Sequence, residues 1–184
     1  MKNNWSIKKQ IQKGFTLVEL LIVVIILAIL AAIVVPQFAS TTDDAKVSSL
    51  DSTLANMRSA IDLYYQQHSS RYPGAYSESD GTTATTTDPT RIAAFKAQLS
   101  LYTDANGKTS TTKTTVYKYG PYLKKADLPA NPVTTVSTLV TVNTGTLGLA
   151  GGGLNGGWRY DVITGQFIAD DTTVGSNGIA YDKH

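Results

Sequence analysis

A long run of apolar residues dominates the first part of the chain. From Phe15 to Val35 the sequence reads FTLVELLIVVIILAILAAIVV, and the charge in this run is carried by Glu19. A helix of about 21 residues is long enough to cross the ~30 Å hydrocarbon layer of a bilayer. The pattern therefore predicts a membrane-spanning helix. It does not favour a core helix, which seldom runs this far without a polar residue, or a secretory signal, which ends in a small-residue cleavage site.

A second apolar pattern follows Pro36 and has the period of an amphipathic helix. Its apolar residues are spaced alternately three and four positions apart, which places them on one face. They are Val47, Leu50, Leu54, Met57, Ile61 and Tyr64. We therefore expect one long helix from about Thr16 to Ser69, kinked at Pro36. Its second half, residues 37–70, needs a partner surface, which residues 71–184 are expected to supply.

The remaining chain predicts a short helix and a small sheet. Asp88 is a candidate N-cap, because Pro89 follows at the first helical position and apolar residues recur at helical spacing up to Leu99. Strands are expected at residues 116–122 and 133–143, in a hairpin of residues 158–162 and 166–169 turning at Gly165, and at residues 178–182. The predicted fold class is α+β: a long kinked N-terminal helix packed on a small, mainly antiparallel sheet.

Charge is distributed unevenly along the chain. There are 16 Lys and Arg against 14 Asp and Glu, a net charge of +2. Four of the lysines, Lys2, Lys8, Lys9 and Lys13, precede Gly14, so the rest of the chain has 12 bases against 14 acids. This remainder lacks the basic field of a nucleic-acid-binding protein, and no nucleic acid partner is expected. The lysines ahead of the apolar run place its N-terminus on the cytoplasmic side of the membrane.

Few residues are candidates for catalysis or cofactor binding. The chain has no cysteine and two histidines, His68 and His184. Neither histidine lies in a triad or metal-ligand pattern, so we expect no enzyme activity, no cofactor and no metal site. His68 is expected in the last turn of the long helix, where the helix dipole favours a cation.

Two further motifs are read as loops. Gly151, Gly153 and Gly156 have dinucleotide-fingerprint spacing, but a strand and not a helix is expected to follow. The C-terminal acids form a possible oxygen-ligand cluster, for which solvated loop residues are the favoured interpretation. They are Asp170, Asp171 and Asp182, with Asn177 beside them.

Glu19 is the most informative residue in the sequence. A carboxylate within a membrane span is costly unless it finds a partner, so it is a functional candidate. If the chain is cut between Gly14 and Phe15, a new α-amine appears four residues before Glu19. The ammonium and the carboxylate could then neutralise each other within one subunit or between neighbours. Placement of Glu19 at the depth of the membrane interface, without such a partner, is the alternative.

The segment from Lys13 to Val24, KGFTLVELLIVV, resembles the N-terminal signature of type IV pilins and type II secretion pseudopilins. The resemblance implies a precursor that prepilin peptidase cuts after Gly14, followed by N-methylation of Phe15. It further implies that Glu19 guides assembly into a helical filament. Such a filament would grow as a homopolymer from an inner-membrane assembly platform, together with minor pilins or pseudopilins. The expected organisation is a cleaved leader (1–14), a transmembrane half-helix (15–36), an amphipathic half-helix (37–70) and a globular domain (71–184).

Two filament types and one unrelated function remain open at this point. The Pro-rich segment 120–132 and the absence of cysteine favour a type II secretion pseudopilin. The alternative is the pilin of a surface pilus used for adhesion, motility or DNA uptake. From a different class, the chain could be a membrane-anchored ligand-binding module, although that function does not explain Glu19 or the Gly14–Phe15 junction. For both filament types the expected location is the bacterial inner membrane for the precursor, then a periplasmic or cell-surface filament.

Overall fold

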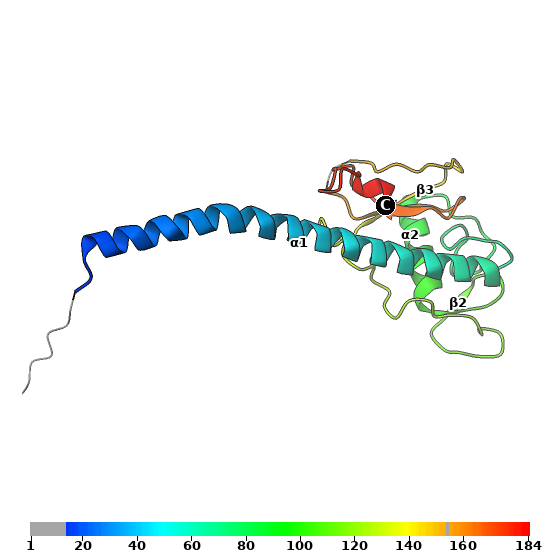
Figure 1. Cartoon of the computed structure of the whole chain (residues 1–184). Helices are drawn as coiled ribbons and strands as arrows, with labels where there is room; N and C mark the ends of the chain where they lie inside the picture. Colours follow the sequence, from blue (N-terminus) through cyan, green and yellow to red (C-terminus); the bar gives the residue numbers. More distant parts are fainter. Residues whose placement is uncertain (1–13, 154) are drawn as a thin grey trace, which may run out of the picture. The chain divides into compact units, whose positions relative to one another are not determined.

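The computed structural model describes residues 14–153 and 155–184. The chain divides into two compact units, one ending at Thr41 and one running from Thr42 to His184. Helix α1 (Leu17–Gln67) begins in the first unit and ends in the second, which contains all the other described elements (Figure 1). The fold class is α+β, as predicted.

Between Leu17 and Val34, α1 is apolar on every side apart from Glu19. The stretch from Leu17 to Val34 is 18 residues long, is apolar enough to cross a membrane, and has none of its side chains buried. At 1.5 Å per residue it extends about 27 Å, close to the thickness of the hydrocarbon layer. The exposed apolar surface of this segment therefore agrees with the predicted membrane-spanning helix.

In the second unit, α1 is amphipathic and buries the predicted face. The six residues spaced three and four apart are all buried, with exposed fractions of 9% or less. They form one core cluster with Phe95 and Leu99 of helix α2 and with Trp158, Tyr160 and Phe167 of the sheet. The partner surface that this helix required is thus supplied by the C-terminal residues, because only there can the apolar side chains leave water.

Helix α2 (Asp88–Ser100) forms where expected, but its cap differs from the prediction. The N-cap is Thr87, whose backbone N–H donates to the Thr90 hydroxyl at 3.2 Å. Asp88 was expected to cap the helix and instead accepts a 2.7 Å hydrogen bond from the backbone N–H of Thr141. The aspartate is thereby used for a tertiary contact with a strand, which leaves the adjacent threonine to satisfy the helix N-terminus.

The main sheet has three strands in the order β3-β4-β5: β3 (Leu139–Val142), β4 (Trp158–Asp161) and β5 (Phe167–Ala169). The predicted hairpin is confirmed: β4 and β5 pair antiparallel, and Gly165 adopts the positive φ of 73° that its turn requires. Strand β3 pairs with β4 in parallel, so this sheet is mixed. The long connection 143–157 allows the parallel pairing, because only a long segment can return the chain to the same end of the sheet.

Two of the predicted strands are wrong. Strands β1 (Tyr102–Thr103) and β2 (Thr109–Ser110) form a separate antiparallel pair, and within residues 116–122 only Tyr119 joins it, through a single bridge to Thr103. Pro121, which has no N–H to donate, prevents a longer strand there. Residues 178–182 give one bridge between Val174 and Ala180, followed by the 3-10 helix η1 (Tyr181–Lys183).

The aromatic core of the sheet has its polar atoms bonded. Phe95 lies 4.6 Å from Tyr160 and Trp158 lies 5.3 Å from Phe167, measured between ring centroids. The Trp158 indole N–H donates to the carbonyl of Pro129 at 2.7 Å, and the Tyr160 hydroxyl donates to that of Pro73 at 3.1 Å. Since a buried donor without a partner is costly, these bonds fix how the loops that carry both prolines cover the sheet.

Candidate functional site

The predicted cleavage site lies just ahead of α1, outside regular structure. Gly14, Phe15 and Thr16 have no helical or strand assignment, and α1 begins at Leu17. Phe15 is 84% exposed, and a Cβ atom placed on Gly14 would meet no atom within 4 Å. The Gly14–Phe15 peptide bond is therefore accessible on its helix-proximal side. The basic leader before Gly14 lies outside the described residues.

Glu19 occupies the first turn of α1 and forms a capping box with Thr16. Its Oε2 accepts the backbone N–H and the hydroxyl of Thr16, each at 2.8 Å. The Thr16 hydroxyl in turn accepts the backbone N–H of Glu19 at 3.2 Å. This reciprocal pair satisfies donors that the first helical turn would otherwise leave free. This role was not predicted from the sequence, although the spacing Thr-x-x-Glu is its known signature.

The capping geometry also bears on the expected ion pair. Consecutive Cα atoms are about 3.8 Å apart, so an α-amine on Phe15 would stand one residue from the Thr16 N–H that Glu19 already binds. The second carboxylate oxygen, Oε1, accepts no hydrogen bond from the described residues. The arrangement can therefore hold one further cationic donor, either from the same chain or from a neighbouring one.

Pro36 lies within α1, and the helix continues without interruption to Gln67. A proline in a helix interior removes one backbone hydrogen bond and clashes with the preceding turn. The kink expected at Pro36 stays a prediction, since its side chain lies outside the part of the molecule described.

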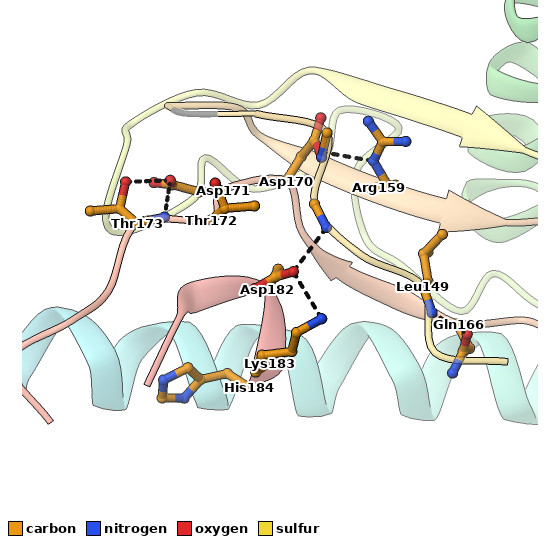
Figure 2. Close-up of polar contacts among 12 residues, drawn as sticks. Leu149, Arg159, Gln166, Asp170, Asp171, Thr172, Thr173, Asp182, Lys183 and His184 are labelled. Carbon is orange, nitrogen blue, oxygen red and sulfur yellow. Dashed lines mark hydrogen bonds and ion pairs between the residues drawn. The ribbon is translucent and has the colours of Figure 1, made fainter. Parts of the chain in front are cut away.

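The C-terminal acids are buried, contrary to the interpretation of solvated loop residues. Asp170, Asp171 and Asp182 are all less than 9% exposed. Figure 2 shows the polar contacts that these residues make. Asp170 accepts the Arg159 Nε–H at 2.8 Å and the backbone N–H of Gly152 at 2.6 Å, while Asp182 accepts that of Gly151 at 3.0 Å. Asp170 and Asp182 thus hold the glycine-rich loop against the sheet, while Asp171 accepts the backbone N–H and the hydroxyl of Thr173.

The same contacts show how the two motifs interpreted as loops, the glycine-rich segment and the C-terminal acids, are held in the fold. The backbone N–H groups of Gly151 and Gly152 bind carboxylates, and the loop leads into strand β4, so it lacks the helix that a dinucleotide fingerprint needs. Asn177 accepts the N–H of Ile179 and does not join the buried acids. In the described residues no group of three or more acids or histidines has the arrangement of a metal site.

His68 was expected in the last turn of α1, but it lies one residue beyond the end of this helix and is completely buried. Its Nδ1 lies 2.8 Å from the carbonyl of Tyr64 and its Nε2 lies 2.9 Å from the Thr103 hydroxyl. A carbonyl can only accept, so Nδ1 carries the proton and Nε2 accepts from Thr103. Burial lowers the pKa of His68, and the ring stacks on Tyr64 at 3.8 Å. It is a neutral core residue, not the dipole-stabilised cation that the sequence suggested.

Residues 9–35 are similar to a known protein family. This segment matches the family model described as the prokaryotic N-terminal methylation motif. The match includes Gly14, Phe15 and Glu19 and ends just before Pro36. No solved structure matches the chain significantly.

Curated relatives extend the similarity beyond this segment. The chain is 37% identical over 113 residues to the type IV narrow pilus major component PilA5 of Thermus thermophilus, covering 56% of this chain and 97% of that protein. It is 38% identical over 66 residues to the type II secretion system core protein G of Klebsiella michiganensis, covering 36% and 46%. For core protein G of Pseudomonas aeruginosa the values are 45% over 53 residues, covering 29% and 37%. The chain thus spans less than half the length of both secretion proteins.

Three observations agree: an exposed Gly–Phe junction, an apolar helix with a carboxylate in its first turn, and similarity over nearly the whole of one pilus component. The chain belongs to the family of type IV pilins and type II secretion pseudopilins.

Proposed function

We propose that this chain is the repeating structural subunit of a type IV pilus-like filament and has no enzymatic role. The observation that carries the proposal is the order of features at the N-terminus. An accessible Gly14–Phe15 bond is followed by an unburied apolar stretch of 18 residues, Leu17–Val34, whose first turn contains Glu19. A membrane anchor alone explains the apolar residues, but it does not explain a carboxylate among them.

The apolar helix and the methylation motif fit a precursor anchored in the inner membrane. The basic residues before Gly14 face the cytoplasm, which puts residues 42–184 on the opposite side of the membrane. The filament that forms from this precursor is periplasmic or exposed on the cell surface.

In this proposal prepilin peptidase cuts after Gly14, and Phe15 is then N-methylated. Residues 15–36 anchor the mature subunit, residues 37–70 connect the anchor to the globular domain, and residues 71–184 form the filament surface. The exposure of Phe15 and the free space around Gly14 support cleavage at this bond, since a protease must reach the backbone from at least one side.

Assembly depends on Glu19 in this proposal. The new amine of Phe15, from an adjacent subunit or from the same chain, neutralises the carboxylate within the apolar environment of the filament. The unused Oε1 and the closeness of Thr16 to the N-terminus support this pairing. Removal of either charge would leave the other unpaired in an apolar environment, which costs several kcal/mol.

A surface type IV pilus is the better supported of the two filament types. The similarity to the Thermus pilus component extends over 97% of that protein. Similarity to the core proteins G covers 46% and 37% of those proteins. The Pro-rich segment 120–132 favours a secretion pseudopilus, which is the second candidate. Both use an inner-membrane assembly platform and minor subunits as partners.

Mass spectrometry of the protein from membranes tests the proposal. The expected mature chain begins at Phe15 and carries one additional methyl group. A mature N-terminus beyond the apolar run would overturn the assignment. A deletion strain then separates the filament types: loss of surface fibres and twitching supports the pilus, and loss of protein secretion with fibres intact supports the pseudopilus.

A further inference from the structure

One segment of the second unit carries a concentration of positive charge. Residues 105–126, here called the basic segment, contain no acid and five lysines: Lys108, Lys113, Lys118, Lys124 and Lys125. Beyond Gly14 the chain has 12 bases and 14 acids, so outside this segment seven bases stand against fourteen acids. Positive charge is therefore concentrated in the basic segment and the rest of the mature chain is acidic, although the net charge of the whole is small.

The fold keeps these lysines in one region. Ser110 pairs with Tyr102 and Tyr119 forms a bridge with Thr103, so the loop 110–119 starts and ends beside β1. Because both of its ends are held there, the middle of this loop reaches no more than about 16 Å from β1. The remainder of the segment is fixed by the Tyr122 hydroxyl, which donates to the Gln67 side chain at 2.7 Å.

The five lysines have no acidic partner within the chain. All five are exposed, and in residues 14–153 and 155–184 none of them makes an ion pair. Lys118 instead lies over the Tyr119 ring, with 5.0 Å from its nitrogen to the ring centroid. The other lysines of the second unit do have acidic partners: Lys46 with Asp43, Lys96 with Asp127, and Lys183 with Asp182.

Helix α1 carries the opposite charge on an exposed face. Asp44, Asp51 and Asp62 are seven and eleven residues apart, which places them within about 20° of one line along the helix. All three are exposed, and the line between the first and last is about 27 Å long. We call these three residues the acidic face.

The acidic face keeps a net negative charge, because its three carboxylates share this side of α1 with one arginine, Arg58. Asp44 accepts a hydrogen bond from Ser176, and Asp62 makes no ion pair in the described part of the chain. Asp51 lies 2.8 Å from Nδ1 of His184, a contact that is an ion pair when the ring is protonated. Arg58 lies on the same side of α1, four residues before Asp62. Its guanidinium donates to the carbonyls of Phe167 and His184 and not to the acids.

The basic segment and the acidic face belong to the same compact unit, yet no ion pair joins them. Two different, complementary surfaces on one subunit suit a head-to-tail contact between copies. Repetition of such a contact produces an open helical assembly when the rotation does not close. A second copy of the chain thus presents the charge that each surface lacks.

We propose that the basic segment of one subunit docks on the acidic face of α1 in a neighbouring copy and sets the contact between globular domains in the filament. The inference rests on the proposed function and adds which surfaces meet. Because the charges are exposed, the attraction is screened within about 8 Å at physiological salt and steers and orients subunits more than it binds them.

Charge reversal in the full chain tests this pairing. Lys124→Glu with Lys125→Glu reverses the basic segment, and Asp44→Lys with Asp62→Lys reverses the acidic face. Lys124→Arg with Lys125→Arg is the matched control, because it keeps the charge. Each protein is compared for membrane content, protease resistance and yield of sheared filaments.

Each reversal alone should lower filament yield roughly tenfold, because like charges then meet. The two reversals together should restore the yield, while the arginine control and the membrane content stay at the wild-type level. Raising salt from about 0.05 M to about 0.5 M should lower the wild-type yield. Normal yield from either reversal, or no restoration when they are combined, would overturn the pairing.

Two further outcomes also overturn it. If wild-type filaments retain duplex DNA or anionic lipid vesicles and the lysine reversal abolishes this retention without changing yield, the segment binds an anionic polymer or membrane instead. If the wild-type chain makes no filaments at all, the proposed function fails, and the inference fails with it.

Discussion

The carboxylate of Glu19 accepts both the backbone N–H and the hydroxyl of Thr16, each at 2.8 Å. Glu19 therefore caps the helix that carries it and is also the charge that assembly is proposed to require. The two roles can be separated by substitution, because a capping box accepts Gln as well as Glu at this position.

Glu19→Gln should keep the cap and lose the charge. We expect normal membrane content and cleavage but a sharp loss of sheared filaments, since the amine of Phe15 then has no counter-charge. Glu19→Ala removes both roles and should assemble as poorly. Thr16→Val removes the hydroxyl, costs the helix about 0.5–2 kcal/mol, and should still assemble. Normal filament yield from Glu19→Ala would show that the carboxylate is incidental.

Gly14→Val should leave an uncleaved precursor in the membrane. Glycine exposes its carbonyl without a Cβ beside it, whereas a β-branched residue crowds the bond that the protease must reach. Immunoblotting for the longer precursor measures this, and Gly14→Ala is the milder control. Complete cleavage of the valine variant would contradict a steric requirement at this position.

Leu54→Asp should destabilise the globular unit. Leu54 is 1% exposed and lies in the core cluster, so an aspartate there is an unpaired buried charge that costs several kcal/mol. A lowered melting temperature of the soluble fragment beginning at Pro36 measures the loss. Ala55→Asp adds the same charge at an exposed neighbouring position and should melt close to the wild type. Equal melting of the two variants would mean that α1 is not packed through Leu54.

The stability of the globular unit should fall as the pH drops below about 6.5, the ordinary pKa of histidine. Burial lowers the pKa of His68 in the folded state, so below that pH the unfolded chain binds a proton that the folded chain resists. Stability conferred by the neutral ring is thus present above the unfolded pKa and is lost on acidification.

Melting temperatures between about pH 7 and pH 5 measure this dependence. His68→Gln should flatten the curve, even if it lowers stability throughout. His184→Asn removes the other histidine, so comparison of the two variants separates the contribution of His68 from the rest. A slope unchanged in His68→Gln would assign the dependence to other groups.

Sequence alone determined the elements whose pattern is local and periodic. The apolar run, the face from Val47 to Tyr64, and the hairpin turning at Gly165 all follow from the alternation of polar and apolar residues and from one glycine. The resemblance to the pilin family rests on contiguous residues from Lys13 to Val24 and could likewise be seen in the sequence. Even the Thr16–Glu19 cap, which was not predicted, has a local signature in the spacing Thr-x-x-Glu.

Tertiary structure decided what depends on contacts between distant residues. Asp88 does not cap α2, because it accepts the backbone N–H of Thr141 instead. Asp170 and Asp182 are buried, because the glycine-rich loop and Arg159 donate hydrogen bonds to them. The parallel pairing of β3 with β4 and the neutral burial of His68 join segments 19 and 35 residues apart. Short polar residues can satisfy their hydrogen bonds in water or in the core, so their place is settled only when the fold brings a partner to them.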